Sequence, residues 1–517
     1  MLIVISDLHF VDETAGKHNL PADAFEDIFL SDVVELAIRK QATEITLLLL
    51  GDIPDLIRST HWFNVPLADR PWGARGLADV QNWRTLHTVL ATPTEQVCLR
   101  ILGELPASGR QEDVPPDTIL SRNWAVFALF RNLEPEIHRR IATRQAELPA
   151  RERLSTMPPV KIIYVPGNHD RLINLYPRLR AAWRDIAGLT IDATTVSGSP
   201  VGTWWYRTDF QNEAYGAYGR HGHQFDLWNY GGGHDSASLE AHLQPPIGDV
   251  IATEFAAGLV WQARQIENRI GPNLITRLED IDNVRPFSRL LEWLYYEMEQ
   301  NKRHRKALDE ITDTVVKNVL NIPFVQQWRT PLTNLDERLR ANRGLRGLGD
   351  LIERLNPSGP DEMVRLATSA PLRWLFGKML DRTDANTLLQ FILFFTGSQN
   401  SGDDDADPYL QGAFREHIWQ NNPAYHFVLY GHTHRPGVWA LDGSNNREVM
   451  YINSGTWRER IQRTTGLDLA ADFIKFKQMT YVVIYGDTEN GGRRGGSKVK
   501  GTPSFDMWTG TKLKQYR

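Results

Sequence analysis

Short aliphatic runs recur along this chain, and most of them end in glycine or in polar side chains. Runs of β-branched and aliphatic residues that are bounded by turn residues are typical of buried strands. They predict strands at Leu2–Ser6, Ile45–Leu50, Lys161–Val165, His426–Tyr430 and Val449–Asn453, a β segment through Thr203–Arg207 and a last core strand at Met479–Tyr485. The predicted strands therefore form groups that are far apart in the sequence.

Helical spacing of apolar residues fills several intervals between these strands. In Ala24–Arg39, the residues Phe25, Phe29 and Val33 recur on one helix face. A strand, a helix and a strand in this order predict a βαβ unit with parallel strands, and hence an α/β fold. The same spacing predicts helices at Val80–Gly103, Trp124–Ala146 and Ile173–Ile186, with a polar loop at Ala107–Asp117.

A long central region has helical periodicity and no strand pattern. Its predicted helices are Val250–Ile270, Phe287–Gln300, Ala307–Val319, Asp336–Leu355 and Met363–Phe376, followed by an acidic loop at Ser401–Pro408. We therefore predict a core in two parts, residues 1–238 and 421–490. A helical insertion at about 56–159 interrupts the first part, a larger helical insertion occupies 239–420, and a flexible basic tail follows at 491–517.

Composition limits the class of protein. The chain has 517 residues, 41% hydrophobic residues and a net charge of -5, which are ordinary values for a soluble globular protein. Its single cysteine, Cys98, excludes an intrachain disulfide framework and an all-cysteine zinc site, and it fits a reducing cytoplasm. No apolar run reaches the roughly 18 residues of a membrane-spanning helix. We therefore expect a soluble cytoplasmic protein without a membrane partner.

Polar residues of a particular kind follow the predicted strands. The motifs are Asp7-Leu8-His9, Gly51-Asp52, Gly167-Asn168-His169-Asp170, His221-Gly222-His223 and Gly431-His432-Thr433-His434. Residues two apart in an extended segment face the same side, so the two members of each pair can point at one object. In the predicted βαβ unit, Asp52 lies beside Asp7 and His9 at one edge of the sheet.

This set of side chains suits divalent metal ions. Carboxylate and amide oxygens mixed with imidazole nitrogens are ligands for borderline ions such as Mn, Fe, Zn, Co or Ni. The ligands are too many for one ion, whereas two ions about 3.5–4 Å apart that share a carboxylate account for their number and type. These physical arguments alone do not decide whether His221 or His223 is a metal ligand.

The motifs and their order resemble those of the calcineurin-like metallophosphoesterase superfamily, D-x-H, G-D, G-N-H-D/E, H-G-x and G-H-x-H. The resemblance covers about Met1–Asp52, Lys161–Asp226 and His426–Trp457, including a turn at Asn453–Trp457, but neither insertion. It implies a four-layer αββα sandwich around two divalent ions, with manganese favoured and Fe, Zn, Co, Ni or Mg as alternatives.

The resemblance also assigns residues. One metal would bind Asp7, His9, Asp52 and His434, and the other would bind Asp52, Asn168, His221 and His432, with Asp52 as the bridge. The family pattern favours His221 over His223. His169 would stand outside the metals as the catalytic group, oriented by Asp170. Candidate substrate-binding residues are Arg58, Arg220 and His223.

The expected activity is hydrolysis of a phosphomonoester or phosphodiester, with nucleotides among the candidate substrates, by a hydroxide held between the metals. His169 would stabilise the transition state or protonate the leaving alkoxide. The superfamily acts on many kinds of phosphate ester, so the resemblance leaves the substrate open.

Three alternatives stay open at this point. A nuclease acting on DNA or RNA ends is suggested by Arg220, by the basic tail and by two basic clusters, Lys302, Arg303, Arg305 and Lys306, and then Arg338, Arg340, Arg343 and Arg346. The net charge opposes this alternative. A hydrolase of lipid-linked pyrophosphates is suggested by the run HGHQFD. The third is a partner-binding scaffold, and the helical insertion is where a protein partner or a second copy would bind.

Overall fold

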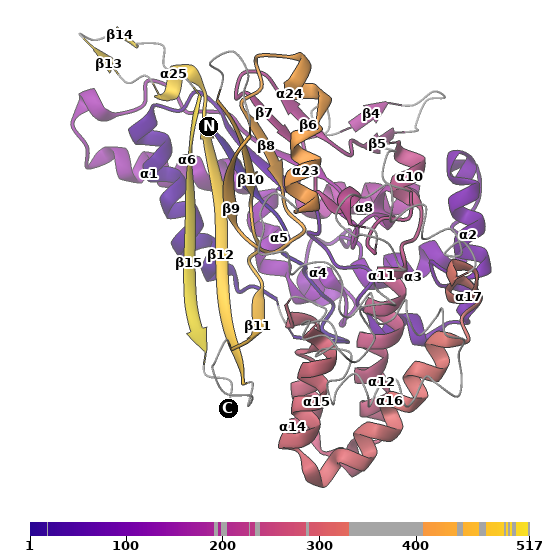
Figure 1. Ribbon diagram of the computed structural model, residues 1–517. Helices are drawn as coiled ribbons and strands as arrows, with labels where there is room; N and C mark the ends of the chain where they lie inside the picture. The colour runs from indigo at the N-terminus through magenta and orange to yellow at the C-terminus, as the bar shows by residue number, and fades with distance from the viewer. Residues whose placement is uncertain are drawn as a thin grey trace, which may run out of the picture.

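The computed structural model has a mixed α/β fold with two larger β-sheets and many helices (Figure 1). It describes residues 1–17, 19–190, 195–197, 204–226, 228–232, 238–285, 289–329, 407–441, 448–464, 472–490, 493–494, 497–498 and 503–514. The predicted helices Asp336–Leu355 and Met363–Phe376, the second basic cluster and most of the acidic loop lie outside the described residues.

The first sheet contains the predicted βαβ unit. Strand β1 (Leu2–Ile5) pairs in parallel with β2 (Ile45–Leu50), and β2 pairs in parallel with β3 (Val160–Val165). Between β1 and β2, a π-helical turn at Ala24–Leu30 continues directly into α1 (Ser31–Lys40). The other neighbour of β1 is the antiparallel strand β12 (Phe473–Tyr485), which also pairs with β11 (Glu459–Arg463).

The second sheet brings distant parts of the chain together. Its order is β6 (Phe210–Asn212), β7 (Ala217–Gly219), β8 (Phe427–Tyr430), β10 (Val449–Asn453) and β9 (Gly437–Leu441). Strand β8 is parallel to both β7 and β10. The segments that follow β7 and β8 therefore leave the sheet at the same edge. A separate small pair is formed by β4 (Thr195–Ser197) and β5 (Trp204–Tyr206).

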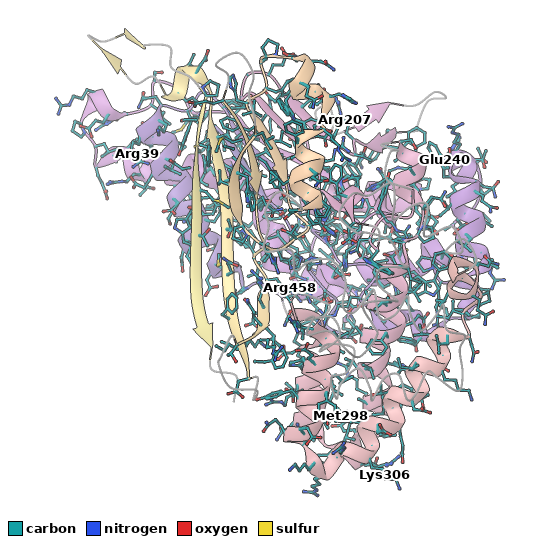
Figure 2. All side chains as sticks on the ribbon, in the orientation of Figure 1. Arg39, Arg207, Glu240, Met298, Lys306 and Arg458 are labelled. Carbon is teal, nitrogen blue, oxygen red and sulfur yellow. The ribbon has the colours of Figure 1, made fainter. Side chains whose placement is uncertain are left out.

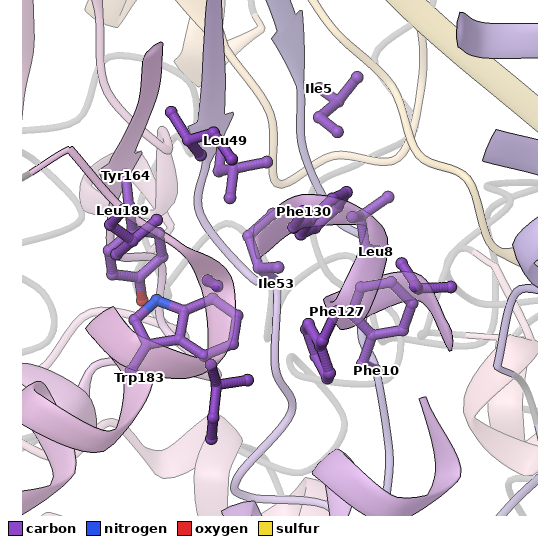
Figure 3. Close-up of a cluster of buried hydrophobic side chains, with 14 of the residues drawn as sticks. Ile5, Leu8, Phe10, Leu49, Ile53, Phe127, Phe130, Tyr164, Trp183 and Leu189 are labelled. Atoms are coloured by element: carbon purple, nitrogen blue, oxygen red, sulfur yellow. The ribbon is translucent and has the colours of Figure 1, made fainter. Parts of the chain in front are cut away.

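Alternate side chains of the first sheet enter two different hydrophobic clusters. Leu2, Val4 and Leu50 share a buried cluster with Leu429 and Ile452 of the second sheet, so the two sheets pack on each other. The opposite face, which includes Ile5, Leu49 and Tyr164, packs against Phe127, Phe130 and Trp183 from helices (Figure 3). The period of two along each strand explains this division.

The helices on that face include α5 (Trp124–Arg131), α6 (Leu133–Ala146) and α8 (Pro177–Ala187). The second sheet has helices of its own. Tyr218 and Tyr430 on its strands cluster with Tyr409 of α23 (Pro408–Phe414) and Trp419 of α24 (His417–Asn421).

Three of the helices predicted before residue 190 are interrupted in the structure. Val80–Gly103 was expected to be continuous, but it is replaced by the end of α2 (Ala74–Gln81), a 3-10 segment and α3 (Pro93–Leu102). The helix α3 starts where it does because Thr92 accepts a hydrogen bond from the amide of Glu95 and proline is favoured at the first helical position. The other two predictions each span two helices: Trp124–Ala146 comprises α5 and α6, and Ile173–Ile186 comprises the end of α7 (Leu172–Leu175) and α8.

The described residues between 239 and 329 are mostly helical, but the predicted helix Val250–Ile270 is divided at Ile266. They contain α10 (Leu239–Leu243), α11 (Ile247–Val250), a π-helical segment (Ile251–Ala257), α12 (Gly258–Gln265), α13 (Glu267–Ile270), α14 (Pro272–Leu278), α15 (Leu290–Gln300), α16 (Arg305–Leu320) and α17 (Pro323–Arg329). Val260, Leu278 and Trp293 belong to a buried cluster that most of these helices share. Within the described ranges, no helix is long and apolar enough to cross a membrane.

The end of the chain differs from the prediction. Met479–Tyr485 is not the last strand of the first sheet, because β15 (Ser504–Lys514) pairs antiparallel with β12 along its length (Figure 1). Part of the segment that we expected to be a flexible tail is therefore a sheet strand. Phe505 and Met507 pack against the cluster between the sheets, and Trp508 stacks on Tyr481 with ring centroids 5.2 Å apart. The remaining short elements are α4 (Ile119–Arg122), α25 (Asp487–Asn490) and the pair β13 (Arg493–Arg494) and β14 (Ser497–Lys498).

We predict that removing β15 destabilises the protein. A chain that ends after residue 502 loses the apolar contacts of Phe505, Met507 and Trp508 and leaves β12 unpaired on that side. The melting temperature should fall by about 5–10 °C. A chain that ends after Lys514 is the matched control and should melt like the full chain. Equal melting temperatures for all three chains would show that the strand contributes nothing to stability.

Candidate metal centre

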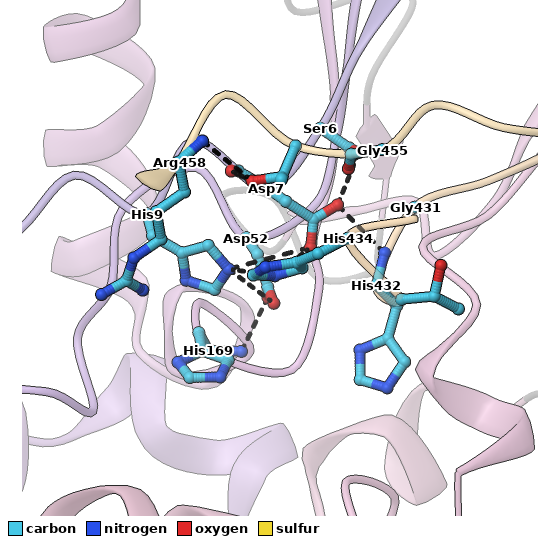
Figure 4. Close-up of polar contacts among 12 residues, drawn as sticks. Ser6, Asp7, His9, Asp52, His169, Gly431, His432, His434, Gly455 and Arg458 are labelled. Carbon is cyan, nitrogen blue, oxygen red and sulfur yellow. Dashed lines mark hydrogen bonds and ion pairs between the residues drawn. The ribbon is translucent and has the colours of Figure 1, made fainter. Parts of the chain in front are cut away.

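The polar residues that follow the strands converge on one place (Figure 4). Asp7 and His9 follow β1, Asp52 follows β2, and His432 follows β8. Three groups of side chains have potential ligand atoms within 4.8 Å of one another, namely Asp7, His9 and His434, then Asp52, His221 and His432, and then His9, Asp55 and His169. Such buried groups of Asp and His could hold a metal ion.

The first group has the geometry of a ligand set. The Nε2 atom of His9 lies 3.0 Å from Nε2 of His434, which in turn lies 3.2 Å from Oδ1 of Asp7. This carboxylate oxygen is buried and makes no hydrogen bond of good geometry with any residue that the structure describes. The other oxygen, Oδ2, accepts hydrogen bonds from the Ser6 hydroxyl and from the backbone amide of His432. Three buried donor atoms therefore face one point, as a bound cation requires.

The second group adjoins the first through Asp52. The Oδ2 atom of Asp52 lies 3.1 Å from Nε2 of His221 and 3.7 Å from Nε2 of His9. Its other oxygen accepts a hydrogen bond of 2.8 Å from the backbone amide of His169. His221 donates from Nδ1 to the carbonyl oxygen of Leu50 over 2.9 Å, which leaves Nε2 directed at Asp52. Asp52 thus stands between the two groups.

Residues that follow His223 hold two of the predicted ligands in place. The Oδ2 atom of Asp226 lies 3.0 Å from Nε2 of His432, and it also accepts a hydrogen bond of 2.8 Å from Asn229. The side-chain nitrogen of Asn168 lies 3.5 Å from Oδ1 of Asn229, and Oδ1 of Asn168 is buried without a hydrogen-bond partner in the described part of the chain. Carboxylates behind ligand histidines are usual in metal sites. Asp226 ends the run HGHQFD, and we predicted no role for it from the sequence.

The backbone is strained at the predicted ligands. Asp7, His9, Asp52, His432 and His434 all have positive φ angles, between 47° and 65°. Residues with a Cβ atom seldom adopt this left-handed conformation, which costs of the order of 1–3 kcal/mol each and is concentrated at functional sites. The fold therefore accepts an energetic cost at the positions where these side chains converge.

Glycines next to the ligands are required for close packing. A Cβ atom on Gly167 would lie 2.2 Å from Oδ1 of Asp52, and one on Gly431 would lie 2.5 Å from Oδ2 of Asp7. A Cβ atom on Gly51 would lie 2.4 Å from Nδ1 of His221. Each glycine thus leaves room for a ligand that comes from another motif. The turn at Asn453–Trp457 also supports the site, because Asn453 donates to the carbonyl of Gly431.

The prediction that Asp170 orients His169 is wrong. Asp170 accepts hydrogen bonds from the backbone amides of Ile53 and Gly167, at 2.9 and 2.5 Å, so it stabilises the turn rather than the imidazole. The carboxylate that faces His169 belongs to Asp55, with Oδ1 3.0 Å from Nδ1. The other oxygen of Asp55 lies 3.2 Å from Nδ1 of His9. The only sequence signal for Asp55 is its position three residues after Asp52, in the same loop.

Burial and charge set the protonation of these groups. Burial alone lowers the pKa of His9, His169 and His221, but neighbouring carboxylates raise the pKa values to about 9, 10 and 9. Burial and then the charge of Asp52 raise the pKa of Asp170 to about 7. The pKa of His434 is instead lowered well below its usual value, by burial and then by Arg285. His434 is therefore neutral, which is the form that binds metal.

The predicted substrate-binding residues lie in three different settings. Arg58 is buried and pairs with Asp282 at 2.6 Å, and Arg220 pairs with Glu416 at 3.1 Å. A carboxylate thus pairs with each guanidinium group within the packed structure, and the substrate-binding role of Arg58 and Arg220 stays a prediction. His223 is buried next to His221, with ring centroids 5.4 Å apart. Among the described residues its ring nitrogens have no hydrogen-bond partner, and burial followed by the charge of His242 lowers its pKa well below 6.5.

Comparison with models of known protein families and with curated proteins gave no match to this chain. The family resemblance therefore rests on the motifs and on the side chains that they bring together.

We predict that Gly167→Ala weakens metal binding. The added methyl group cannot coexist with the Asp52 carboxylate in its present position. Displacement of a group that orients ligands typically costs about 10–100-fold in metal affinity. Titration of the metal-free protein with Mn²⁺ measures the change. Gly219→Ala is the control, since its Cβ would meet neighbours only at 3.4 Å or more. Equal Mn²⁺ affinity in both variants would show that the clash is harmless.

We predict that the metal-free protein loses stability as the pH rises from 7.5 to 10. Folded His9, His169 and His221 keep their protons up to about pH 9–10, whereas unfolded histidines lose theirs near 6.5. The folded state therefore binds more protons in this window, so its free energy of unfolding falls as the pH increases. Thermal unfolding in the presence of EDTA measures the trend.

The same thermal unfolding is measured with Mn²⁺ in place of EDTA for comparison. Ligand histidines must lose their protons to bind a metal, so the stabilisation by Mn²⁺ should grow over the same pH range. A metal-free melting temperature that stays constant or rises towards pH 10 would contradict the assigned charges.

Proposed function

We propose that this protein is a two-metal hydrolase of phosphoester bonds, related to the calcineurin-like metallophosphoesterases. One observation carries the proposal. Strand-end motifs far apart in the sequence supply two adjacent groups of buried ligand atoms, and Asp52 lies within reach of both, 3.1 Å from His221 and 3.7 Å from His9. A shared carboxylate is the usual bridge in two-metal phosphatases and nucleases.

The packing of the chain supports the same relationship. The two sheets share one buried cluster, helices cover the outer face of the first sheet, and α23 and α24 cover that of the second. Helices, the first sheet, the second sheet and further helices thus pack in that order, and a four-layer αββα sandwich requires the same order. We therefore include that architecture in the proposal.

The residues have separable roles in the proposed reaction. Bound at the two groups, divalent ions would activate water and neutralise the charge of the phosphoryl oxygens. Manganese fits the mixed Asp, Asn and His donors, as do several other divalent ions. His169 would donate a proton from Nε2 to the leaving-group oxygen, while Asp55 holds its Nδ1 at 3.0 Å. The buried carboxylate of Asp170 would keep the turn that carries His169 rigid.

The alternatives have less support. The cluster of Lys302, Arg303, Arg305 and Lys306 lies where the chain turns from α15 into α16, and Figure 2 places Lys306 well away from Arg458 beside the metal centre. A nuclease should retain duplex or single-stranded DNA at low salt with a steep salt dependence. A scaffold needs none of the ligand positions, yet each of them is filled here, which favours catalysis.

The function is tested by hydrolysis of p-nitrophenyl phosphate and bis-p-nitrophenyl phosphate by the manganese-loaded protein. We expect turnover of at least one ester. His169→Ala should retain bound metal and lose about 10²–10⁴-fold in turnover, because it removes a general acid. Asp52→Ala should lose metal as well as turnover, because both ligand groups depend on that carboxylate. His87→Ala, outside the three groups, is the control.

Absence of metal-dependent turnover of either ester would contradict the proposed function. Loss of metal in His169→Ala to the same extent as in Asp52→Ala would contradict the role of His169 alone.

A further inference from the structure

The helical insertion contributes a short extended segment to the metal centre. Val284 forms a parallel bridge with Ile461 of β11, and the amide of Arg285 donates to the carbonyl of Ile461 over 2.8 Å. Next to it, Asp282 pairs with Arg58 and with Arg458, both at 2.6 Å. The insertion is therefore fixed to the sheet at this point by backbone pairing and by buried charge.

Arg285 extends from this segment to a predicted metal ligand. Its Nη1 atom donates to the carbonyl oxygens of Asp282 and Val284, at 2.7 and 2.9 Å, which fixes one side of the guanidinium group. Its Nε atom lies 3.3 Å from Nδ1 of His434. The opposite ring nitrogen of His434 faces His9 and Asp7. The guanidinium group is thus one imidazole ring away from the metal ligands.

The charges around Arg285 leave an excess of positive charge. Arg58 and Arg458 share the single carboxylate of Asp282, and Arg285 forms no ion pair with a carboxylate in the described part of the chain. Arg460 adds a further cation, since its Nη1 donates to the carbonyl oxygen of His434. Two divalent ions would still exceed the combined charge of Asp7, Asp52 and Asp55, the three buried carboxylates of the centre. This side of the centre therefore attracts an anion.

Metal binding also changes the partner of Arg285. A neutral imidazole has one lone pair, so a His434 that binds metal through Nε2 carries its proton on Nδ1. That nitrogen then cannot accept the hydrogen bond from Arg285. With a metal on Nε2 of His434, the Nε–H group of Arg285 would lose its acceptor, and a phosphoryl oxygen is an acceptor of the kind that arginine prefers.

We propose that Arg285 binds a non-bridging oxygen of the substrate and thereby selects phosphomonoesters over phosphodiesters; this inference rests on the proposed function. A monoester has three non-bridging phosphoryl oxygens, of which two can face the metals and the third can face Arg285. A diester has only two, so it has no oxygen left for the arginine. The helical insertion would thus determine the substrate class through one side chain.

The test compares Arg285→Ala, Arg285→Lys and the control Arg269→Ala, an exposed arginine of the same insertion that pairs with Glu310 at 2.7 Å. With manganese-loaded protein, kcat/KM of Arg285→Ala should fall about 100-fold for p-nitrophenyl phosphate and less than about threefold for bis-p-nitrophenyl phosphate. Arg285→Lys should recover part of the loss, because it restores the charge but not the planar fork. The control should match the wild type.

Two binding measurements separate this role from a structural one. Inorganic phosphate, titrated calorimetrically into the manganese-loaded protein, should bind Arg285→Ala about tenfold more weakly than the wild type. Mn²⁺ should bind the metal-free variant as tightly as the wild type or about threefold more tightly, because a repelling cation is gone. A residue that only supports the fold would weaken both.

Three results would overturn the inference. They are equal losses for the two esters, unchanged affinity for phosphate, or weakened binding of Mn²⁺ in Arg285→Ala. Wild-type protein that hydrolyses neither ester would overturn the proposed function, and this inference with it.

Discussion

The structure depends on burying several carboxylates and imidazoles against one another. Asp7, Asp52 and Asp55 are inaccessible to water, and an isolated buried carboxylate would cost several kcal/mol. Each is offset by facing imidazoles and by backbone amides, such as those of His169 and His432. The same concentration of charge holds the pKa values of His9 and His221 near 9. A cation at the centre would replace these protons, so one arrangement serves both stability and the proposed chemistry.

The surrounding chain conforms to this constraint. Strand ends from the two sheets approach each other more closely than ordinary residues allow. They can do so because the backbone is left-handed at Asp7, His9 and Asp52, and because Gly167 and Gly431 have no side chain. The strand pairs β1–β2–β3 and β7–β8 set the direction of approach. The insertions pack against this core from outside, and Arg285 extends inward as far as His434. The insertions therefore supply residues around the predicted metal ligands and not the ligands themselves.

The sequence predicts the parts of this structure that local patterns determine. Ile45–Leu50 is a strand because it is a continuous aliphatic run, and Asp52 joins Asp7 because a βαβ unit has parallel strands. What could not be predicted depends on contacts between distant residues. Asp55 rather than Asp170 faces His169 because the loop after β2 folds across the turn after β3, and no local pattern encodes that crossing. The roles of Asp226 and Arg285 depend on the same kind of contact. β15 was not predicted because the basic, glycine-rich residues that precede it indicated a flexible tail.

The central claim is that Asp52 lies between two metal ions. Anomalous diffraction from manganese-soaked crystals, recorded at the manganese absorption edge, tests it most directly. The account predicts two peaks about 3.5–4 Å apart that flank the Asp52 carboxylate, one beside His9 and His434 and the other beside His221 and His432. A single peak, or peaks away from Asp52, would contradict it.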